Sequence, residues 1–187
     1  PHIPVILDAK RGDIGTTAAQ YASEAFDRYD ADAVTVNPYM GGDTLLPYST
    51  RADKGVVVLC KTSNAGSGEL QNLTLDSGHK LFEQVAINAS KEWKENNNLL
   101  LVVGATYPEE LKKIRELAGD MPFLIPGIGA QGGDVKATLE AGLRADGKGL
   151  IISSSRGIIY AGDTATGFAE KAKQASEELK ELINKYR

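Results

Sequence analysis

Short apolar runs alternate with amphipathic stretches along the whole chain. The apolar runs are bounded by polar residues, glycine or proline, which is typical of buried β-strands. Between them, apolar residues recur three or four positions apart, which is typical of helices with one buried side. The predicted strands cover residues 3–8, 33–36, 56–60, 99–103, 123–125 and 149–152. The predicted helices cover residues 16–28, 44–48, 79–96, 134–142 and 166–185, and one more begins at residues 107–110. Residues 65–69 are predicted to be a flexible Gly/Ser stretch.

This alternation of strands and helices predicts one α/β domain. Such a pattern forms a parallel sheet through right-handed crossovers. Two closures fit it: an open doubly wound sheet, or a (β/α)₈ barrel without its first two β/α units. Such barrels have about 250 residues, and two units of about 30–40 residues each would bring this 187-residue chain to that size. Because the chain enters a core strand soon after Pro1, we expect it to be the C-terminal part of a longer protein.

The composition narrows the classes of partner and site. The net charge of −4 gives no reason to expect nucleic acid or an anionic membrane as a partner. No apolar run approaches the length that crosses a bilayer. The single cysteine, Cys60, lies in an apolar strand and has no partner for a disulfide, which suits a reducing cytoplasm. His2 and His79 are isolated and lack metal-ligand spacing, so no metal site is predicted.

Charged residues gather where the first predicted strand ends. That strand is expected to be buried on both faces, as in a parallel sheet. Asp8 ends it and Lys10 comes two residues later, and since successive side chains alternate in an extended chain, the two are expected on the same face. Gly12 then allows a turn, and Asp13 lies in the loop before a helix. Parallel sheets carry their ligands at these strand ends, so an amine between two carboxylates predicts proton chemistry. The alternative is a structural ion pair.

Two later strand ends are suited to binding a phosphate. Residues 126–133 are rich in glycine and lead into a helix, so backbone N–H groups and the helix dipole can meet an anion. Residues 153–157 supply Arg156, whose guanidinium matches phosphate oxygens. The alternative is that the glycines serve only turns. A nicotinamide cofactor is disfavoured, because no acidic strand end follows at the distance a ribose requires. Ser63 lacks a nearby histidine and is better suited to hydrogen bonding a polar ring than to nucleophilic attack.

Five motifs, in order along nearly the whole chain, carry a resemblance to a known family. They are Asp8-Ala-Lys10-Arg-Gly-Asp13-Ile14, Asn37-Pro-Tyr39, Thr62-Ser63-Asn64, Pro126-Gly-Ile-Gly-Ala-Gln-Gly-Gly133 and Ser155-Arg156-Gly157. Together they resemble the orotidine 5′-monophosphate decarboxylases, in the bacterial type 2-like branch with a Lys-Arg-Gly-Asp motif. The resemblance implies a (β/α)₈ TIM barrel, with residues 1–187 as a single domain of its last six β/α units. It also implies a cytoplasmic homodimer that converts orotidine 5′-monophosphate to uridine 5′-monophosphate in de novo pyrimidine biosynthesis, with no metal or organic cofactor.

The resemblance further implies roles for individual residues. Asp8, Lys10 and Asp13 would form a charged catalytic network, in which Lys10 protonates C6 of the pyrimidine. Asp13 and Thr17 would reach across the dimer interface. The residues implied to bind substrate are Ile14, Thr17, Ser63, Pro126, Ile128, Gln131 and Arg156. Those implied to hold the 5′-phosphate are Gln131, Gly132, Arg156 and Gly157. A further lysine and a further aspartate of this family's site come from the first two strands, which this sequence lacks.

Two other functions stay open at this point. One is a Mg²⁺-dependent sugar-phosphate decarboxylase or hexulose-phosphate synthase of the same barrel group. The other is a barrel that binds a phosphate ligand without catalysis. Sensitivity to a chelator and loss of substrate absorbance separate these functions from the metal-independent decarboxylase.

Overall fold

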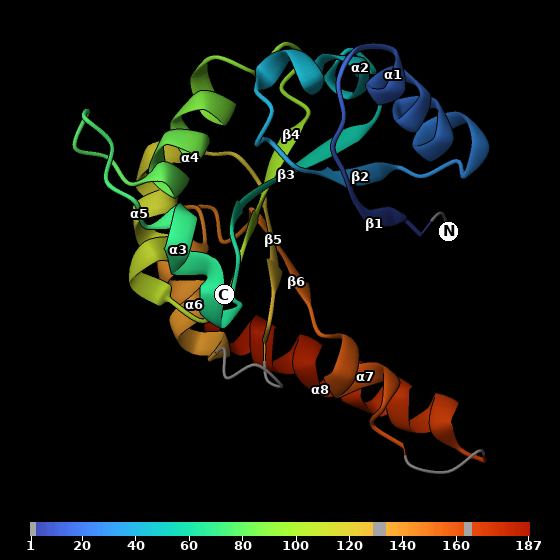
Figure 1. Ribbon diagram of the computed structural model, residues 1–187. Coiled ribbons are helices and arrows are strands. Elements are labelled where there is room, and N and C mark those ends of the chain that lie inside the picture. Colours follow the sequence, from blue (N-terminus) through green and yellow to red (C-terminus); the bar gives the residue numbers. More distant parts are fainter. Residues whose placement is uncertain (1–2, 129–133, 163–165) are drawn as a thin grey trace.

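Six parallel strands form one curved sheet in the computed structural model, which describes residues 3–128, 134–162 and 166–187 (Figure 1). The strands are β1 (Ile6–Arg11), β2 (Ala33–Val36), β3 (Gly55–Lys61), β4 (Leu99–Val103), β5 (Phe123–Pro126) and β6 (Leu150–Ser153). Each strand pairs with its neighbours in the sequence, in the order β1 to β6. A doubly wound sheet would reverse its order at a switch point, so this order excludes that alternative. The fold is an open half-barrel, an incomplete form of the expected TIM barrel.

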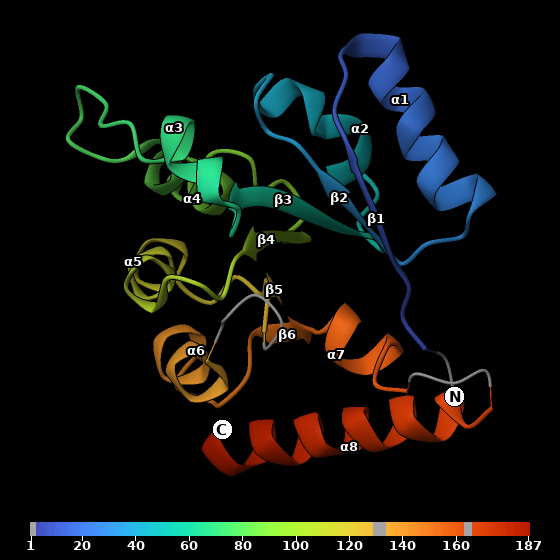
Figure 2. The ribbon, with the colours of Figure 1, turned by 60° about the horizontal axis from the view of Figure 1, so that its bottom comes forward.

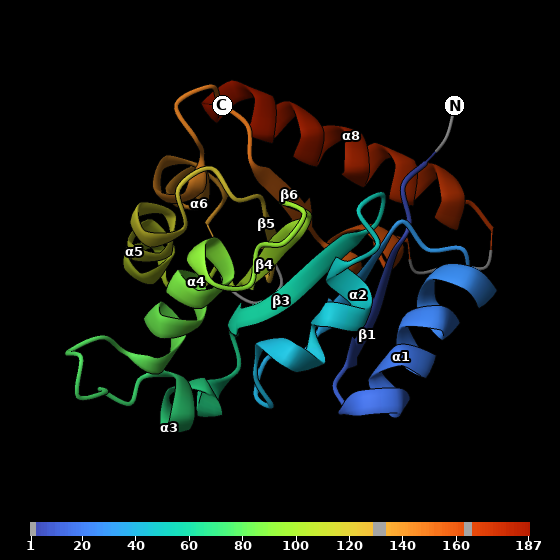
Figure 3. The ribbon, with the colours of Figure 1, turned by 90° about the horizontal axis from the view of Figure 1, so that it is seen from above.

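Helices lie between the strands and after the last one, and several of them cover the convex face of the sheet (Figures 2 and 3). They are α1 (Gly15–Ser23), η1 (Glu24–Arg28), η2 (Gly42–Thr44), α2 (Leu46–Ser49), η3 (Ala65–Ser67), α3 (Gly68–Gln71), α4 (Leu81–Lys91), α5 (Pro108–Ala118), α6 (Val135–Gly142), α7 (Ser155–Ile159) and α8 (Phe168–Tyr186). Figures 2 and 3 show α1, α2, α4, α5 and α6 around the outside of the curved sheet. In both views α8 lies across the open side between β6 and the start of β1. None of these helices is both long enough and apolar enough to cross a membrane.

The core lies mainly between the sheet and the outer helices. Val56 and Val58 of β3 face this layer, where they pack with helical residues such as Phe82 and Ile114. The alternate residue Val57 faces the concave side, in a smaller cluster with Ala33 and Val102. Apolar side chains on both faces are what a parallel sheet inside a barrel requires. The central strands therefore match the buried runs that the sequence predicts.

The first strand differs from its prediction. It spans Ile6–Arg11 rather than residues 3–8, and it is half-buried rather than buried. The physical reason is its position, because β1 is an edge strand with a neighbour, β2, on one side only. Ile3 and Val5 precede it and are exposed. At the other edge, Ile151 of β6 is exposed for the same reason.

Helix boundaries follow local signals where those signals are strong. Pro108 opens α5 in its first turn, as predicted. Asp134 caps α6 by accepting a hydrogen bond from the backbone N–H of Ala137 at 2.6 Å. The predicted helix 79–96 is shorter, since α4 ends at Lys91. Beyond it, the side-chain amide of Asn98 donates hydrogen bonds to three backbone carbonyls between α2 and β3. Those contacts hold the chain in a non-helical path.

One segment predicted as flexible is helical. Residues 65–71 form η3 and α3. The backbone N–H of Thr62 donates to Oε1 of Gln71 at 3.0 Å, and Nε2 of Gln71 donates back to the hydroxyl of Thr62 at 2.9 Å. This reciprocal pair ties α3 to the end of β3. Arg156 and Gly157, which follow the sixth strand as predicted, lie in the short helix α7.

Candidate active site

Asp8 and Lys10 meet at the carboxyl end of β1, as predicted. The ammonium Nζ of Lys10 lies 2.6 Å from Oδ1 of Asp8. Simple strand alternation is not the reason, because β1 has a register shift between Leu7 and Arg11. Lys10 itself adopts a φ of 49°, a left-handed conformation that is uncommon for a residue with a β-carbon. A local distortion of the strand therefore brings the amine onto the carboxylate.

The environment keeps the carboxylate of Asp8 ionised. Partial burial alone would raise its pKa, but hydrogen bonds from Lys10 and Thr35, together with the charge of Lys10, lower the pKa below its ordinary value. Both side chains stay accessible, with 61% of Asp8 and 48% of Lys10 exposed. The pair is thus charged, hydrogen-bonded and open to a ligand.

Thr35 of β2 is a part of this site that the sequence patterns did not identify. Its side chain is fully buried, at 0% exposure. Its hydroxyl Oγ1 lies 2.9 Å from the backbone nitrogen of Lys10 and 2.9 Å from Oδ1 of Asp8. Threonine is common in strands, so residue type alone could not have distinguished this one.

Arg11 anchors the loop that follows Lys10. Its Nε and Nη2 lie 2.9 and 2.8 Å from Oε2 of Glu24, and its guanidinium stacks 4.9 Å from the ring centroid of Tyr21. The predicted residues Asp13, Ile14 and Thr17 follow on the rim. Asp13 is half-buried and Ile14 and Thr17 are exposed. Among the described residues, Asp13 forms no ion pair with Lys10 of its own chain.

The end of β3 places Ser63 on the same rim. Ser63 is half-buried, and Gly104 after β4 lies so close that a β-carbon there would be 2.9 Å from that of Ser63. Lys61, the last residue of β3, is 2% exposed. Its Nζ lies 3.2 Å from Oγ of Ser67 and 3.5 Å from Oε2 of Glu110. The sequence analysis did not single out Lys61. The signal that could have identified it is its place as a charged residue at the end of an otherwise apolar strand.

The predicted phosphate-binding residues end the last two strands. Pro126 of β5 is in register with Ser153 of β6, so the two strand ends lie side by side. Ile128 is buried at 4% exposure. Arg156 and Gly157 follow in α7, where both are exposed. Gln131 and Gly132 lie outside the described residues. Since all six strands are parallel, the described candidates share one rim of the half-barrel.

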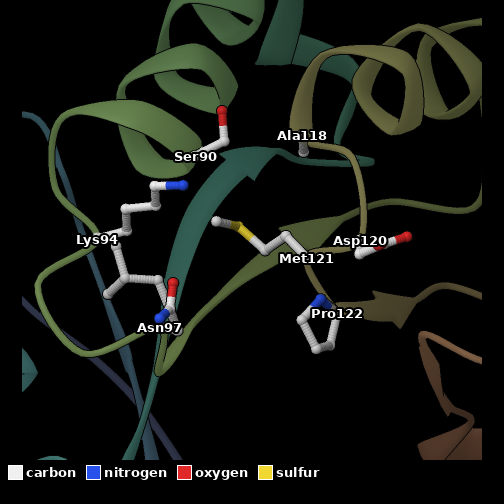
Figure 4. A pocket seen from close by; sticks show the side chains of 8 residues that line it. Ser90, Lys94, Asn97, Ala118, Asp120, Met121 and Pro122 are labelled. Atoms are coloured by element: carbon white, nitrogen blue, oxygen red, sulfur yellow. The ribbon is translucent and has the colours of Figure 1, made fainter.

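One hollow of the surface lies away from this candidate site. A cavity of about 260 Å³ is lined by Ser90, Lys94, Leu99 and Pro122, among others (Figure 4). It lies at the amino ends of β4 and β5, and active sites of such barrels lie at the carboxyl ends. A groove of about 590 Å³ lies at the carboxyl ends of β2 and β3, where Tyr39 and Thr62 line it together with residues of α4 such as Val85. Within the described residues, no group of three or more His, Cys, Asp or Glu side chains is placed to hold a metal ion.

Comparisons with known proteins identify the family of the chain. A family model described as Orotidine 5′-phosphate decarboxylase / HUMPS family matches residues 2–170. The orotidine 5′-phosphate decarboxylase of Janthinobacterium sp. is 59% identical over 186 residues, which cover 100% of this chain and 68% of that protein. That of Cellvibrio japonicus is 57% identical over 184 residues, covering 98% of this chain and 67% of that protein.

A solved structure agrees with the fold. The OMP decarboxylase of Leishmania donovani superposes with a TM-score of 0.85 at 48% sequence identity, covering 97% of this chain and 69% of that chain. This chain thus spans about two thirds of each of these relatives, in line with a barrel that lacks part of its units. The resemblance carried by the sequence motifs is confirmed. The chain belongs to the orotidine 5′-phosphate decarboxylase / HUMPS family, in which it matches the decarboxylases.

Proposed function

We propose that the protein decarboxylates orotidine 5′-monophosphate to uridine 5′-monophosphate in pyrimidine synthesis, and that Lys10 is the acid that protonates C6. The two relatives described above, which match at least 98% of the chain, carry this activity in their names. The observation that supports a role for Lys10 is its ammonium group, held 2.6 Å from the Asp8 carboxylate on the rim of strand ends. A half-exposed charged pair at this place is available to a substrate.

The chemistry requires a cation near C6. Loss of CO₂ leaves an electron pair on C6 that the pyrimidine ring delocalises poorly. An ammonium about 4 Å away stabilises such a charge by roughly 4 kcal/mol at an effective dielectric constant of about 20. The same ammonium can then donate its proton to C6, which forms the C–H bond of the product and leaves a neutral amine. Enzymatic accelerations correspond to at least about 8 kcal/mol, so Lys10 alone is insufficient.

Binding of the rest of the nucleotide supplies the remaining stabilisation in this proposal. Arg156 and Gly157, with Gln131 and Gly132, would hold the 5′-phosphate. Ser63 would contact the polar edge of the pyrimidine. Pro126, Ile128 and Ile14 would line the pocket. Interactions with these remote groups hold the reacting carbon in place while CO₂ departs.

The proposal includes a homodimer in which Asp13 and Thr17 complete the partner's site. Two observations support this arrangement. Both residues lie on the rim, at the surface of the described chain. Asp13 also makes no ion pair with its own Lys10 within the described residues, which leaves its carboxylate for another partner. Asp8 would lie where the substrate carboxylate binds, kept ionised by Lys10.

The test uses the full-length protein and the ultraviolet absorbance of orotidine 5′-monophosphate. Lys10→Ala is expected to lower kcat by at least about a thousandfold, because about 4 kcal/mol of stabilisation is lost together with the proton donor. Binding of uridine 5′-monophosphate should survive in this variant. Arg156→Ala should instead weaken binding of the nucleotide far more than binding of uridine. Lys112→Ala, an exposed change on α5, is the matched control.

Each outcome distinguishes between the functions left open above. Near-normal turnover of Lys10→Ala would end the proposed mechanism. Loss of turnover on adding a chelator would favour a Mg²⁺-dependent enzyme of the same barrel group. Tight binding of the nucleotide without any loss of absorbance in the unaltered protein would favour a binding barrel without catalysis.

A further inference from the structure

We propose that Thr35 is a positioning residue for the reaction, whose buried hydroxyl holds Lys10 and Asp8 in the geometry that decarboxylation needs. This inference rests on the proposed function of Lys10. Thr35 lies on β2, 25 residues from Lys10 in the sequence, and bonds to both members of the pair. The three groups form a closed arrangement of one hydroxyl, one carboxylate and one lysine.

The backbone of Lys10 is the first element that Thr35 holds. The N–H of Lys10 donates to Oγ1 of Thr35 at 2.9 Å. At this point the register between β1 and β2 shifts, so Lys10 lies outside the regular ladder of strand hydrogen bonds. Its φ of 49° is disfavoured for an L-residue other than glycine. The hydroxyl therefore takes the place of a strand carbonyl as acceptor, and it stabilises the turn that aims the side chain.

The carboxylate of Asp8 is the second element. The hydroxyl of Thr35 has one proton, and Oδ1 of Asp8 at 2.9 Å is a better acceptor than the carbonyl of Leu7 at 3.5 Å. The same oxygen Oδ1 accepts the hydrogen bond from Nζ of Lys10 at 2.6 Å. Two donors on one oxygen fix the rotation of the carboxylate. They thereby fix the place of the ammonium, since Nζ sits at the end of a long flexible side chain.

The burial of Thr35 is the third argument. Its neighbours in β2, Val34 and Val36, are apolar and at most 1% exposed. A valine at position 35 would suit such a strand, and a buried hydroxyl costs free energy unless it is hydrogen-bonded. Here the hydroxyl donates a hydrogen bond to Asp8 and accepts one from the backbone N–H of Lys10, and both of these residues belong to the candidate site. Packing alone does not require a hydroxyl at this position.

The experiment compares Thr35→Val with Thr35→Ser in the full-length protein. Valine keeps the shape and removes the hydroxyl, whereas serine keeps the hydroxyl. Removal of a hydrogen bond to a charged group is expected to lower kcat about ten- to a hundredfold. Serine should restore kcat to within about threefold. The Kd for uridine 5′-monophosphate should stay within about threefold in both variants, because the phosphate-binding residues are untouched. A crystal structure of Thr35→Val should show a changed φ at Lys10.

A matched control is available at Thr138 of α6. It is also fully buried, and its hydroxyl has no hydrogen-bond partner among the described residues. Thr138→Val should leave kcat unchanged, which separates positioning from a general effect of losing a buried hydroxyl. Circular dichroism establishes that all variants are folded.

The outcomes separate this inference from the proposed function. If Lys10→Ala is inactive and Thr35→Val has normal kcat, the inference about Thr35 is wrong while the role of Lys10 stands. An equal loss in Thr35→Val and Thr35→Ser would also refute it, because the hydroxyl would then not be the active group. If Lys10→Ala is active, the proposed function itself is wrong.

Discussion

The arginine at the amino-end rim of the sheet allows a stability prediction independent of the candidate site. Arg115 of α5 donates hydrogen bonds to the backbone carbonyls of Gly142 at 2.8 Å, Gly119 at 2.6 Å, Met121 at 2.7 Å and Gly149 at 3.3 Å. Its guanidinium carbon lies 3.7 Å from the ring centroid of Phe123. These groups belong to the ends of α5 and α6 and to the starts of β5 and β6. One side chain therefore joins four segments of the C-terminal half of the chain.

The magnitude follows from the individual contacts. The bonds to Gly142 and Met121 are short and partly buried, and each is worth about 1–2 kcal/mol as a bond from a charged donor. The bond to Gly119 is exposed, and water can replace it. The bond to Gly149 is long, at 3.3 Å. The stacking on Phe123 adds about 0.5–1 kcal/mol. Arg115→Met is thus expected to lower the free energy of unfolding by about 2.5–5 kcal/mol.

Arg115→Lys tests the geometric part of this argument. Lysine keeps the positive charge, but one ammonium cannot reach four carbonyls as a planar guanidinium does. Burial lowers the pKa of Arg115 to about 10, with the charge of Arg144 as a lesser cause. The surroundings therefore disfavour a positive charge, and keeping the charge in a lysine does not preserve the stabilisation. We expect the lysine variant to lose about 2 kcal/mol.

The assay is equilibrium unfolding in urea, followed by far-ultraviolet circular dichroism at pH 7. The unfolding midpoint should fall in both Arg115 variants at an unchanged slope. The exposed variant Lys112→Ala is the control on the same helix, and kcat of the folded fraction should be unchanged. A loss below about 1 kcal/mol for Arg115→Met, or equal stability of the lysine and arginine forms, would refute the reasoning.

Three further predictions concern buried or paired groups. Burial raises the pKa of Tyr48 to about 12, and its hydroxyl has no hydrogen-bond partner among the described residues. Stability should therefore be complete below about pH 10, the ordinary pKa of tyrosine, and fall as the pH rises toward about 12. Tyr48→Phe should remove most of this alkaline loss in urea titrations, and an unaltered loss contradicts the prediction. The pKa of Asp8 is lowered despite its partial burial, because of Lys10 and Thr35. The stability difference between Asp8→Asn and the unaltered protein should therefore stay constant from pH 7 to about pH 4, near the ordinary pKa of aspartate. It should shrink only at lower pH. A difference that already shrinks near pH 6 would contradict this prediction. Lys61→Met should cost about 3 kcal/mol, since it leaves the Glu110 carboxylate unpaired. Adding Glu110→Gln should recover part of this loss, and purely additive losses would argue against the pairing.

The fold could be predicted from the sequence to the extent that its signals are local. The period of the apolar residues located the six strands, and the residues of 99–103 agree with β4 at both ends. Pro108 and Asp134 marked the starts of α5 and α6, because the first turn of a helix has backbone N–H groups without partners. The polar residues after each strand indicated the rim, since the ends of parallel strands meet at one edge.

The closure of the sheet was ambiguous from pattern alone. An alternating β/α pattern fits both a doubly wound sheet and a barrel, and the choice depends on the spatial order of the strands. That order is a property of the whole sheet. The exposure of β1 was mispredicted for a similar reason. Its apolar residues are those of a buried strand, but burial requires a neighbour on each side.

What the sequence determined by itself was the kind of chemistry at the rim: which charged residues follow which strands, and the family motifs that contain them. Only the tertiary structure decided how those residues are held. The hydroxyl of Thr35 reaches Lys10 across 25 positions of sequence, and Lys61 reaches Glu110 across 49. The left-handed turn at Lys10 likewise depends on the contact with β2. Periodicity reports which side of an element is buried, whereas contacts between distant segments arise from the packing of the whole chain.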